Sequence, residues 1–142
     1  MSSFTSPLYV RVEQKEEKRR GLLTLIRPFE YHVGHLGSGE VITVPTGFQT
    51  DGLSIPGILR WWFPVLGKAG KAAVVHDYIL YTKMYSKKRA AEIFLECMEV
   101  LEVSKTRRTL MYWAVRYWPW ISDVRQYDDL EPVAFCQECP AV

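Results

Sequence analysis

The spacing of apolar residues changes near the middle of the chain. Up to about residue 45, apolar and polar residues alternate in short runs, whereas from residue 69 apolar residues recur every three or four positions. A repeat of two is typical of a half-buried strand, and a repeat near 3.6 is typical of an amphipathic helix. The chain therefore predicts an α+β fold, with a small antiparallel sheet in the N-terminal half packed on helices in the C-terminal half.

Short alternating runs predict the strands of that sheet at residues 8–13, 21–26, 29–33 and 40–44. Pro28 separates the second run from the third, because proline cannot donate a ladder hydrogen bond. Glycines 34, 37 and 39 supply the turn before the last run. We expect all of these strands to pair in one sheet.

Three helices are expected, at residues 69–81, 87–102 and 105–118. Ser86 is suited to cap the second helix, and Pro119 ends the third. The residues expected to face inward are Ala72, Ala73, His76, Ile79 and Leu80 on the first helix, Ala90, Ile93, Phe94, Cys97 and Leu101 on the second, and Leu110, Met111, Ala114, Val115 and Trp118 on the third.

Length and pattern predict a single domain over residues 1–118 followed by an extended C-terminal tail over residues 119–142, where no period is visible. Cys97, Cys136 and Cys139 do not make an even disulfide framework, which favours folding in the cytosol. The N-terminus lacks the basic start and apolar run of a signal peptide, and no apolar run approaches the length of a membrane span.

The charge distribution argues against specific binding of nucleic acid. The formal net charge is only +2, and the basic residues are scattered along the chain. Aromatic residues are abundant at 13% of the chain. Such rings either fill a core or anchor a protein interface.

The densest group of chemically capable side chains lies in the strand, loop and helix of residues 41–81. Asp51 and Ser54 follow the last predicted strand, and His76 and Asp77 lie on the first helix. In this arrangement His76 is a candidate general base, held in one tautomer by Asp51. Asp77 is a candidate second acid, and Ser54 a candidate nucleophile.

Each of these residues also has a structural interpretation. His76 on an apolar helix face is equally suited to a buried structural role, with a hydrogen bond to satisfy its ring. Asp77 could accept backbone N–H bonds from the preceding loop, and Ser54 could cap a short helix that begins at Pro56. A third alternative is a metal site made by His76, Asp77 and Asp51, so any metal or cofactor stays unknown at this stage.

A second set of metal-ligating residues is spread over the chain. The pairs Cys136/Cys139 and His32/His35 together have the composition of a zinc site. One strand cannot aim both histidines the same way without a turn at Gly34, so free thiols and surface histidines are the preferred interpretation.

Four segments, at residues 43–56, 72–81, 87–94 and 108–118, together resemble the DUF1353 family of small phage and prophage proteins. They read TVPTGFQTDGLSIP, AAVVHDYILY, KKRAAEIF and RTLMYWAVRYW. Leu53 replaces a small alanine of the family pattern, and Glu92 replaces an aspartate. By the helical period, Glu92 faces solvent together with Glu96 and Glu99.

The resemblance implies a bacteriophage context but no reaction. We therefore expect a non-enzymatic structural or assembly component of the virion, associated with the phage tail. It would be made in the host cytoplasm and would contact other virion proteins or further copies of this chain. The alternative is a small envelope-directed hydrolase, acting on peptidoglycan, peptide or lipid, with His76 as general base and Asp51 or Asp77 assisting.

The sharpest expectation from the sequence is that Asp51 and His76 are hydrogen-bonded partners. Since an unpaired buried polar group costs about 1–3 kcal/mol, Asp51→Asn should lower the free energy of unfolding if the pair is structural. If the pair is catalytic, the same change should abolish activity with little loss of stability. Denaturation and NMR titration of His76 test this, and an identical titration in both proteins would contradict the pairing.

Overall fold

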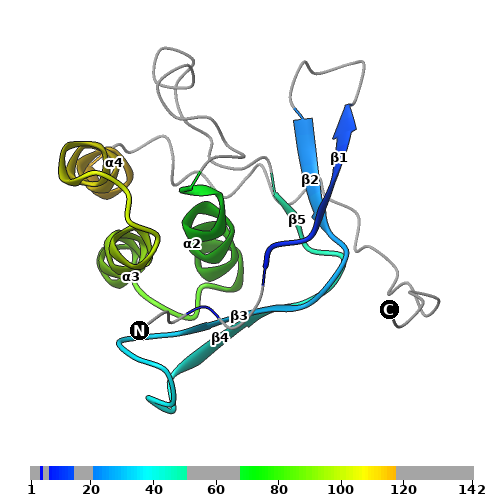
Figure 1. The fold of residues 1–142 in the computed structure, drawn as a ribbon, viewed down its shortest axis with the longest axis horizontal. Coiled ribbons are helices and arrows are strands. Elements are labelled where there is room, and N and C mark those ends of the chain that lie inside the picture. The colour runs from blue at the N-terminus through cyan, green and yellow to red at the C-terminus, as the bar shows by residue number, and fades with distance from the viewer. Residues whose placement is uncertain (1–3, 5–6, 15–20, 51–67, 118–142) are drawn as a thin grey trace.

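A computed structural model describes residue 4 and residues 7–14, 21–50 and 68–117 (Figure 1). Its strands are β1 (Val10–Gln14), β2 (Gly21–Leu25), β3 (Phe29–His32), β4 (Val41–Val44) and β5 (Gln49–Thr50), and its helices are α2 (Gly70–Thr82), α3 (Lys87–Val100) and α4 (Lys105–Tyr117). Strands precede helices along the chain, so the predicted α+β class is confirmed. Among the helices of the described residues, none is long and apolar enough to cross a membrane.

Within the described residues the strands form two small antiparallel sheets, which corrects the expectation of one. In the first, β2 lies between β1 and β5, and in the second β3 pairs with β4. The division falls at Ile26–Pro28, where the chain turns between β2 and β3. Strand β5 was not predicted, because two residues, Gln49 and Thr50, are too few to show a period.

The β3–β4 hairpin confirms the predicted alternation. Phe29 and Tyr31 are buried whereas Glu30 between them is exposed. On β4, Ile42 and Val44 are buried, whereas Val41 and Thr43 are exposed. One face of this hairpin therefore belongs to the core, as a repeat of two requires.

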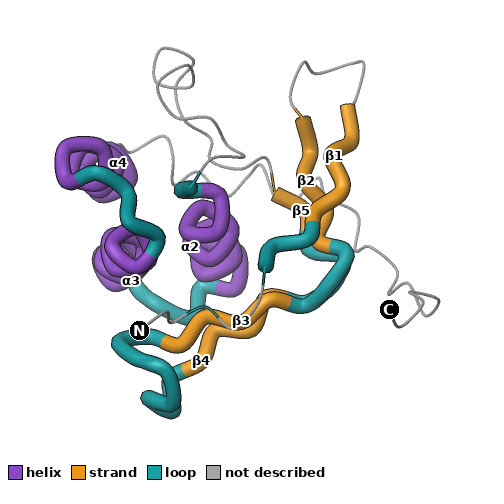
Figure 2. The backbone as a smooth tube through the Cα atoms, in the orientation of Figure 1, coloured by secondary structure: helices purple, strands orange, loops and turns teal. Residues whose placement is uncertain are grey.

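Helix α2 lies at the centre of the molecule, against α3 on one side and β4 on another (Figure 2). The predicted inward face of α2 is buried apart from Leu80, which is half-buried, and Val74, Val75 and Asp77 on its other sides are buried as well. Small and β-branched residues occupy most of the buried positions. An all-round apolar surface is typical of a helix enclosed by its neighbours.

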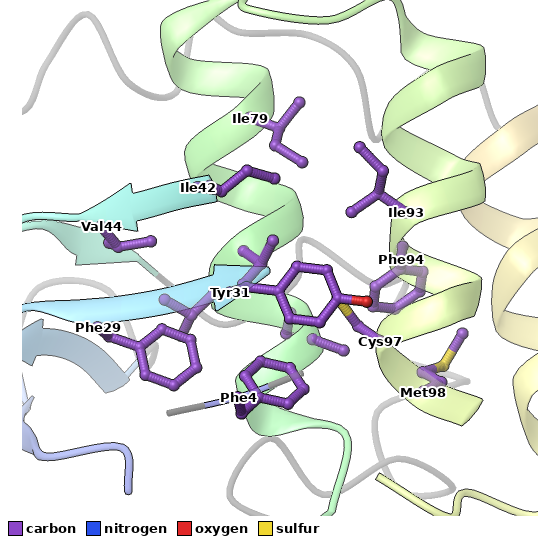
Figure 3. Packing of buried hydrophobic residues seen from close by; sticks show 14 of the residues in the cluster. Phe4, Phe29, Tyr31, Ile42, Val44, Ile79, Ile93, Phe94, Cys97 and Met98 are labelled. Atoms are coloured by element: carbon purple, nitrogen blue, oxygen red, sulfur yellow. The ribbon is translucent and has the colours of Figure 1, made fainter. Parts of the chain in front are cut away.

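The core joins the β3–β4 hairpin to α2 and α3 (Figure 3). The ring of Phe4 lies 5.4 Å from that of Phe29 and 4.7 Å from that of Tyr31, which closes this core near the N-terminus. The larger side chains that complete it are Ile42, Val44, Ile79, Ile93, Phe94, Cys97 and Met98. Burial of these apolar surfaces is the main stabilising contribution.

Helices α3 and α4 differ in how far they are buried. Ser86 caps α3 as predicted, because its hydroxyl accepts a hydrogen bond from the backbone N–H of Arg89 at 3.2 Å. The predicted apolar stripe of α3 is buried, apart from Leu101, which is half-buried. On α4 only Met111 is buried, and Leu110, expected to face inward, is exposed.

The helical period had placed Glu96 on α3 toward solvent, but this side chain is only partly exposed. Its Oε1 atom accepts hydrogen bonds from the hydroxyl of Tyr31 and, at 2.6 Å, from the backbone N–H of Gly34. Burial raises the pKa of Tyr31 well above its ordinary value, and the neighbouring Cys97 and Glu96 raise it further. This contact ties β3 and its following turn to α3.

Replacing Tyr31 by phenylalanine should therefore lower the free energy of unfolding by about 1.5–3 kcal/mol, since the lost bond is to a charged group. The matched control is Tyr85→Phe, because Tyr85 donates a similar bond of 2.6 Å to Glu40 at a more exposed position. The control should change stability by less than about 1 kcal/mol. Urea denaturation measures both, and equal losses would contradict the role of the Tyr31 bond.

The same variant should change how stability depends on pH. A raised pKa in the folded protein means that unfolded chains release the Tyr31 proton first, near the ordinary value of 10.0. The contribution of Tyr31 is complete below about pH 10 and is lost as the pH rises further. The difference in free energy of unfolding between the original protein and Tyr31→Phe should therefore become smaller as the pH rises above about 10. Burial also raises the pKa of Cys97, but that thiol is present in both proteins.

Candidate functional site

Asp77 connects α2 to the short strand β5. Asp77 is 5% exposed, and its Oδ2 atom accepts a hydrogen bond from the Thr50 hydroxyl. Thr50 is fully buried at the end of β5. The sequence had suggested backbone N–H groups of residues 52–54 as partners of Asp77, and this loop lies outside the described residues. The role of Thr50 was missed, since β5 itself showed no periodic signal.

His76 is 2% exposed and lies beside Asp77. The ring centroid of His76 lies 5.0 Å from that of Phe94 on α3. Its Nδ1 atom is 3.7 Å from Asp77 Oδ1, and within the described residues this nitrogen has no hydrogen-bond partner. Neighbouring positions on a helix diverge by about 100°, yet these two side chains approach each other.

The structure thus places two of the four candidate site residues together. Asp51 and Ser54 lie outside the described residues, so the Asp51–His76 hydrogen bond stays a prediction. Within the described part of the chain, no group of three His, Cys, Asp or Glu side chains could hold a metal ion. A metal site that includes Asp51 is not tested by this finding.

The arrangement has two chemical uses. Thr50 fixes one carboxylate oxygen of Asp77, and the other oxygen is turned toward His76. An imidazole beside a carboxylate has the composition of a general base and its orienting acid, although 3.7 Å between Nδ1 and Oδ1 is longer than a hydrogen bond. Equally, a buried polar group of this kind joins strand to helix and specifies how they pack.

Glu92 belongs to a separate, partly exposed network at the start of α3. Tyr85 donates a hydrogen bond of 2.6 Å to Glu40, and this bond, followed by burial, raises the pKa of Tyr85. Arg89 lies 3.9 Å from Glu40 and 3.5 Å from Glu92. Glu92 therefore pairs with the residue three positions earlier on its own helix, in an ion pair of the kind that contributes little to stability.

Helix α4 presents an exposed aromatic face, which we define as Leu110, Trp113 and Tyr117. These side chains are 49%, 53% and 60% exposed, respectively. The rings of Trp113 and Tyr117 stack at a centroid distance of 4.6 Å, and the Arg116 guanidinium lies 5.2 Å from the Tyr117 centroid. The spacing of three and four residues was visible in the sequence, but it did not reveal which side of α4 packs on α3.

This chain is similar to a protein family and to a protein of a bacterium. A family model described as "Protein of unknown function (DUF1353)" matches residues 23–115. An uncharacterized protein, y4jT, of Sinorhizobium fredii is 34% identical over 94 residues, which cover 62% of this chain and 27% of that protein. The chain thus spans about a quarter of the length of this relative. No solved structure matches.

The Thr50–Asp77 contact makes a direct prediction about stability. Thr50→Val removes the hydroxyl and leaves a buried carboxylate oxygen without that donor, so the free energy of unfolding should fall by about 1–3 kcal/mol. Thr43→Val, on the outward face of β4, is the matched control and should change stability by no more than about 0.5 kcal/mol. Urea denaturation that finds equal effects would show that the buried bond contributes nothing.

Proposed function

We propose that this chain, which belongs to the DUF1353 family, is a non-enzymatic structural component of a bacteriophage particle. The specific proposal is a tail-associated protein that binds its neighbours through the aromatic face of α4. The phage context comes from the family resemblance of its four sequence segments. The mode of action comes from the surface of α4.

The observation that carries this proposal is the exposure of Leu110, Trp113 and Tyr117 on one side of one helix. Large apolar side chains scattered singly over a surface require no explanation, but adjoining ones are typical of interaction sites. Tryptophan and tyrosine are enriched among residues that dominate binding energy. Stacking of the two rings also restricts their rotamers before a partner arrives, which reduces the entropy lost on binding.

The surroundings of His76 support the same proposal. A general base must come within hydrogen-bond distance of the proton that it removes. His76 is almost fully buried, beside Phe94 and Asp77. Asp77 is in turn bound to Thr50 inside the molecule. This geometry suits a side chain that fixes α2 in the core better than one that receives a substrate.

One observation favours a second candidate function. Nδ1 of His76 has no hydrogen-bond partner within the described residues, and a carboxylate lies 3.7 Å away. An imidazole with an unused nitrogen beside a carboxylate has the composition of a general base. The second candidate is therefore hydrolysis of an envelope component, with His76 activating water and Asp51 or Asp77 assisting.

Particle composition tests the first candidate. In particles purified from a bacterium that carries this gene, mass spectrometry should detect the protein. Replacing both Leu110 and Trp113 by alanine should lower its incorporation at least about tenfold, because loss of two anchor side chains exceeds 1.4 kcal/mol of binding. The control is Leu36→Ala, in which the replaced leucine is 52% exposed on the β3–β4 turn, and its incorporation should be unchanged.

Two results would contradict this proposal. These are absence of the protein from the particles and incorporation of the double variant as efficiently as the control. Release of fragments from peptidoglycan, peptide or lipid by the purified protein, lost in His76→Gln, would instead establish the hydrolase. Thermal denaturation of each variant identifies any loss that comes from unfolding.

A further inference from the structure

We infer that the aromatic face of α4 binds an acidic segment of a partner protein, in which carboxylates flank at least one large apolar side chain. The inference rests on the proposed docking role of this face and specifies the chemistry of its partner. Between residues 105 and 117 the chain has four basic residues and no acidic residue. The basic residues are Lys105, Arg107, Arg108 and Arg116.

Two of these cations are already engaged within the protein. Arg108 lies 3.3 Å from Glu99 on α3, and Arg116 lies over the ring of Tyr117. Lys105 and Arg107 are exposed, and neither forms an ion pair with a described carboxylate. Both occupy the first turn of α4, where the helix dipole adds partial positive charge. This end of the helix therefore favours an anionic partner.

Lys105, Arg107 and the aromatic face lie within reach of one ligand. Arg107 precedes Leu110 by three positions, so the two are neighbours on the helix surface. From Lys105 to Tyr117 the helix is about 18 Å long, at a rise of 1.5 Å per residue. An extended segment of about five or six residues spans this length. Such a segment can place carboxylates near Lys105 and Arg107 and an apolar side chain against Trp113.

A second copy of this chain fits the surface less well. Pairing α4 with itself would bring together two helices that have basic residues and no carboxylates between residues 105 and 117. In an antiparallel pair, Lys105 and Arg107 of one copy would approach Arg116 of the other. Like charges at an interface disfavour association, so the charge pattern selects against self-pairing.

Single-stranded nucleic acid also fits less well. Such ligands stack their bases on open aromatic faces. Trp113 and Tyr117 stack on each other at an interplanar angle of 18°, and Arg116 also lies over Tyr117. The ring surfaces are thus partly occupied, whereas the ring edges remain suited to contact an apolar or aromatic side chain of a peptide.

The test is selection of random 12-residue peptides, displayed on yeast, for binding to the full chain. The selected peptides should be enriched in Asp and Glu around a Trp, Phe or Leu. Isothermal titration calorimetry of a synthetic selected peptide should show at least tenfold weaker binding to Lys105→Glu/Arg107→Glu and to Trp113→Ala. Lys87→Glu/Lys88→Glu is the matched control, because it reverses two exposed cations in the first turn of α3, and its affinity should stay within twofold.

Several outcomes would overturn the inference. Selected peptides without acidic enrichment, or binding that Lys105→Glu/Arg107→Glu leaves intact, would remove the acidic partner. Binding of a 20-residue oligothymidylate that Trp113→Ala abolishes would assign the face to nucleic acid. A dimer in sedimentation that Trp113→Ala dissociates would assign it to a second copy. Particle incorporation is measured separately, so a failure here is distinguishable from failure of the proposed function.

Discussion

The enclosure of α2 is the constraint on which the rest of the structure depends. This helix contacts α3 and β4, and eight of its 13 residues are buried. Ala72 and Ala73 leave room for neighbouring elements to approach closely. A polar side chain on such a helix must find a partner inside the protein, because water does not reach it. The Thr50–Asp77 hydrogen bond meets that requirement and also fixes the end of β5.

Each of the two sheets is attached to a different helix by a side-chain hydrogen bond. Thr50 of the first sheet binds Asp77 on α2, and Tyr31 of the second binds Glu96 on α3. Since α2 and α3 also pack on each other, these contacts bring two small sheets into one structure. A two-stranded sheet such as β3–β4 is at best marginally stable alone, so the bonds and the apolar core act together.

The buried polar residues and the exposed apolar residues lie in different parts of the molecule. His76 and Asp77 are enclosed near the centre, whereas Trp113 and Tyr117 lie on the outermost helix, which packs on α3 (Figure 1). The first group has the composition of a catalytic site but little access to solvent. The second has the exposure and charge pattern of a binding surface. For this reason the proposed function is centred on α4, with His76 as the basis of the second candidate.

The sequence by itself determined the type and order of the described elements other than β5. Alternation located the strands at residues 29–33 and 40–44, and the helical period with Ser86 located α3, because these signals depend only on nearby residues. Only the tertiary structure decided that there are two sheets, that α2 is enclosed, that Glu96 binds Tyr31 and that Leu110 is exposed. A helical period identifies which residues share a face. The elements that pack against the helix decide which of its faces are buried, and whether one face or several are.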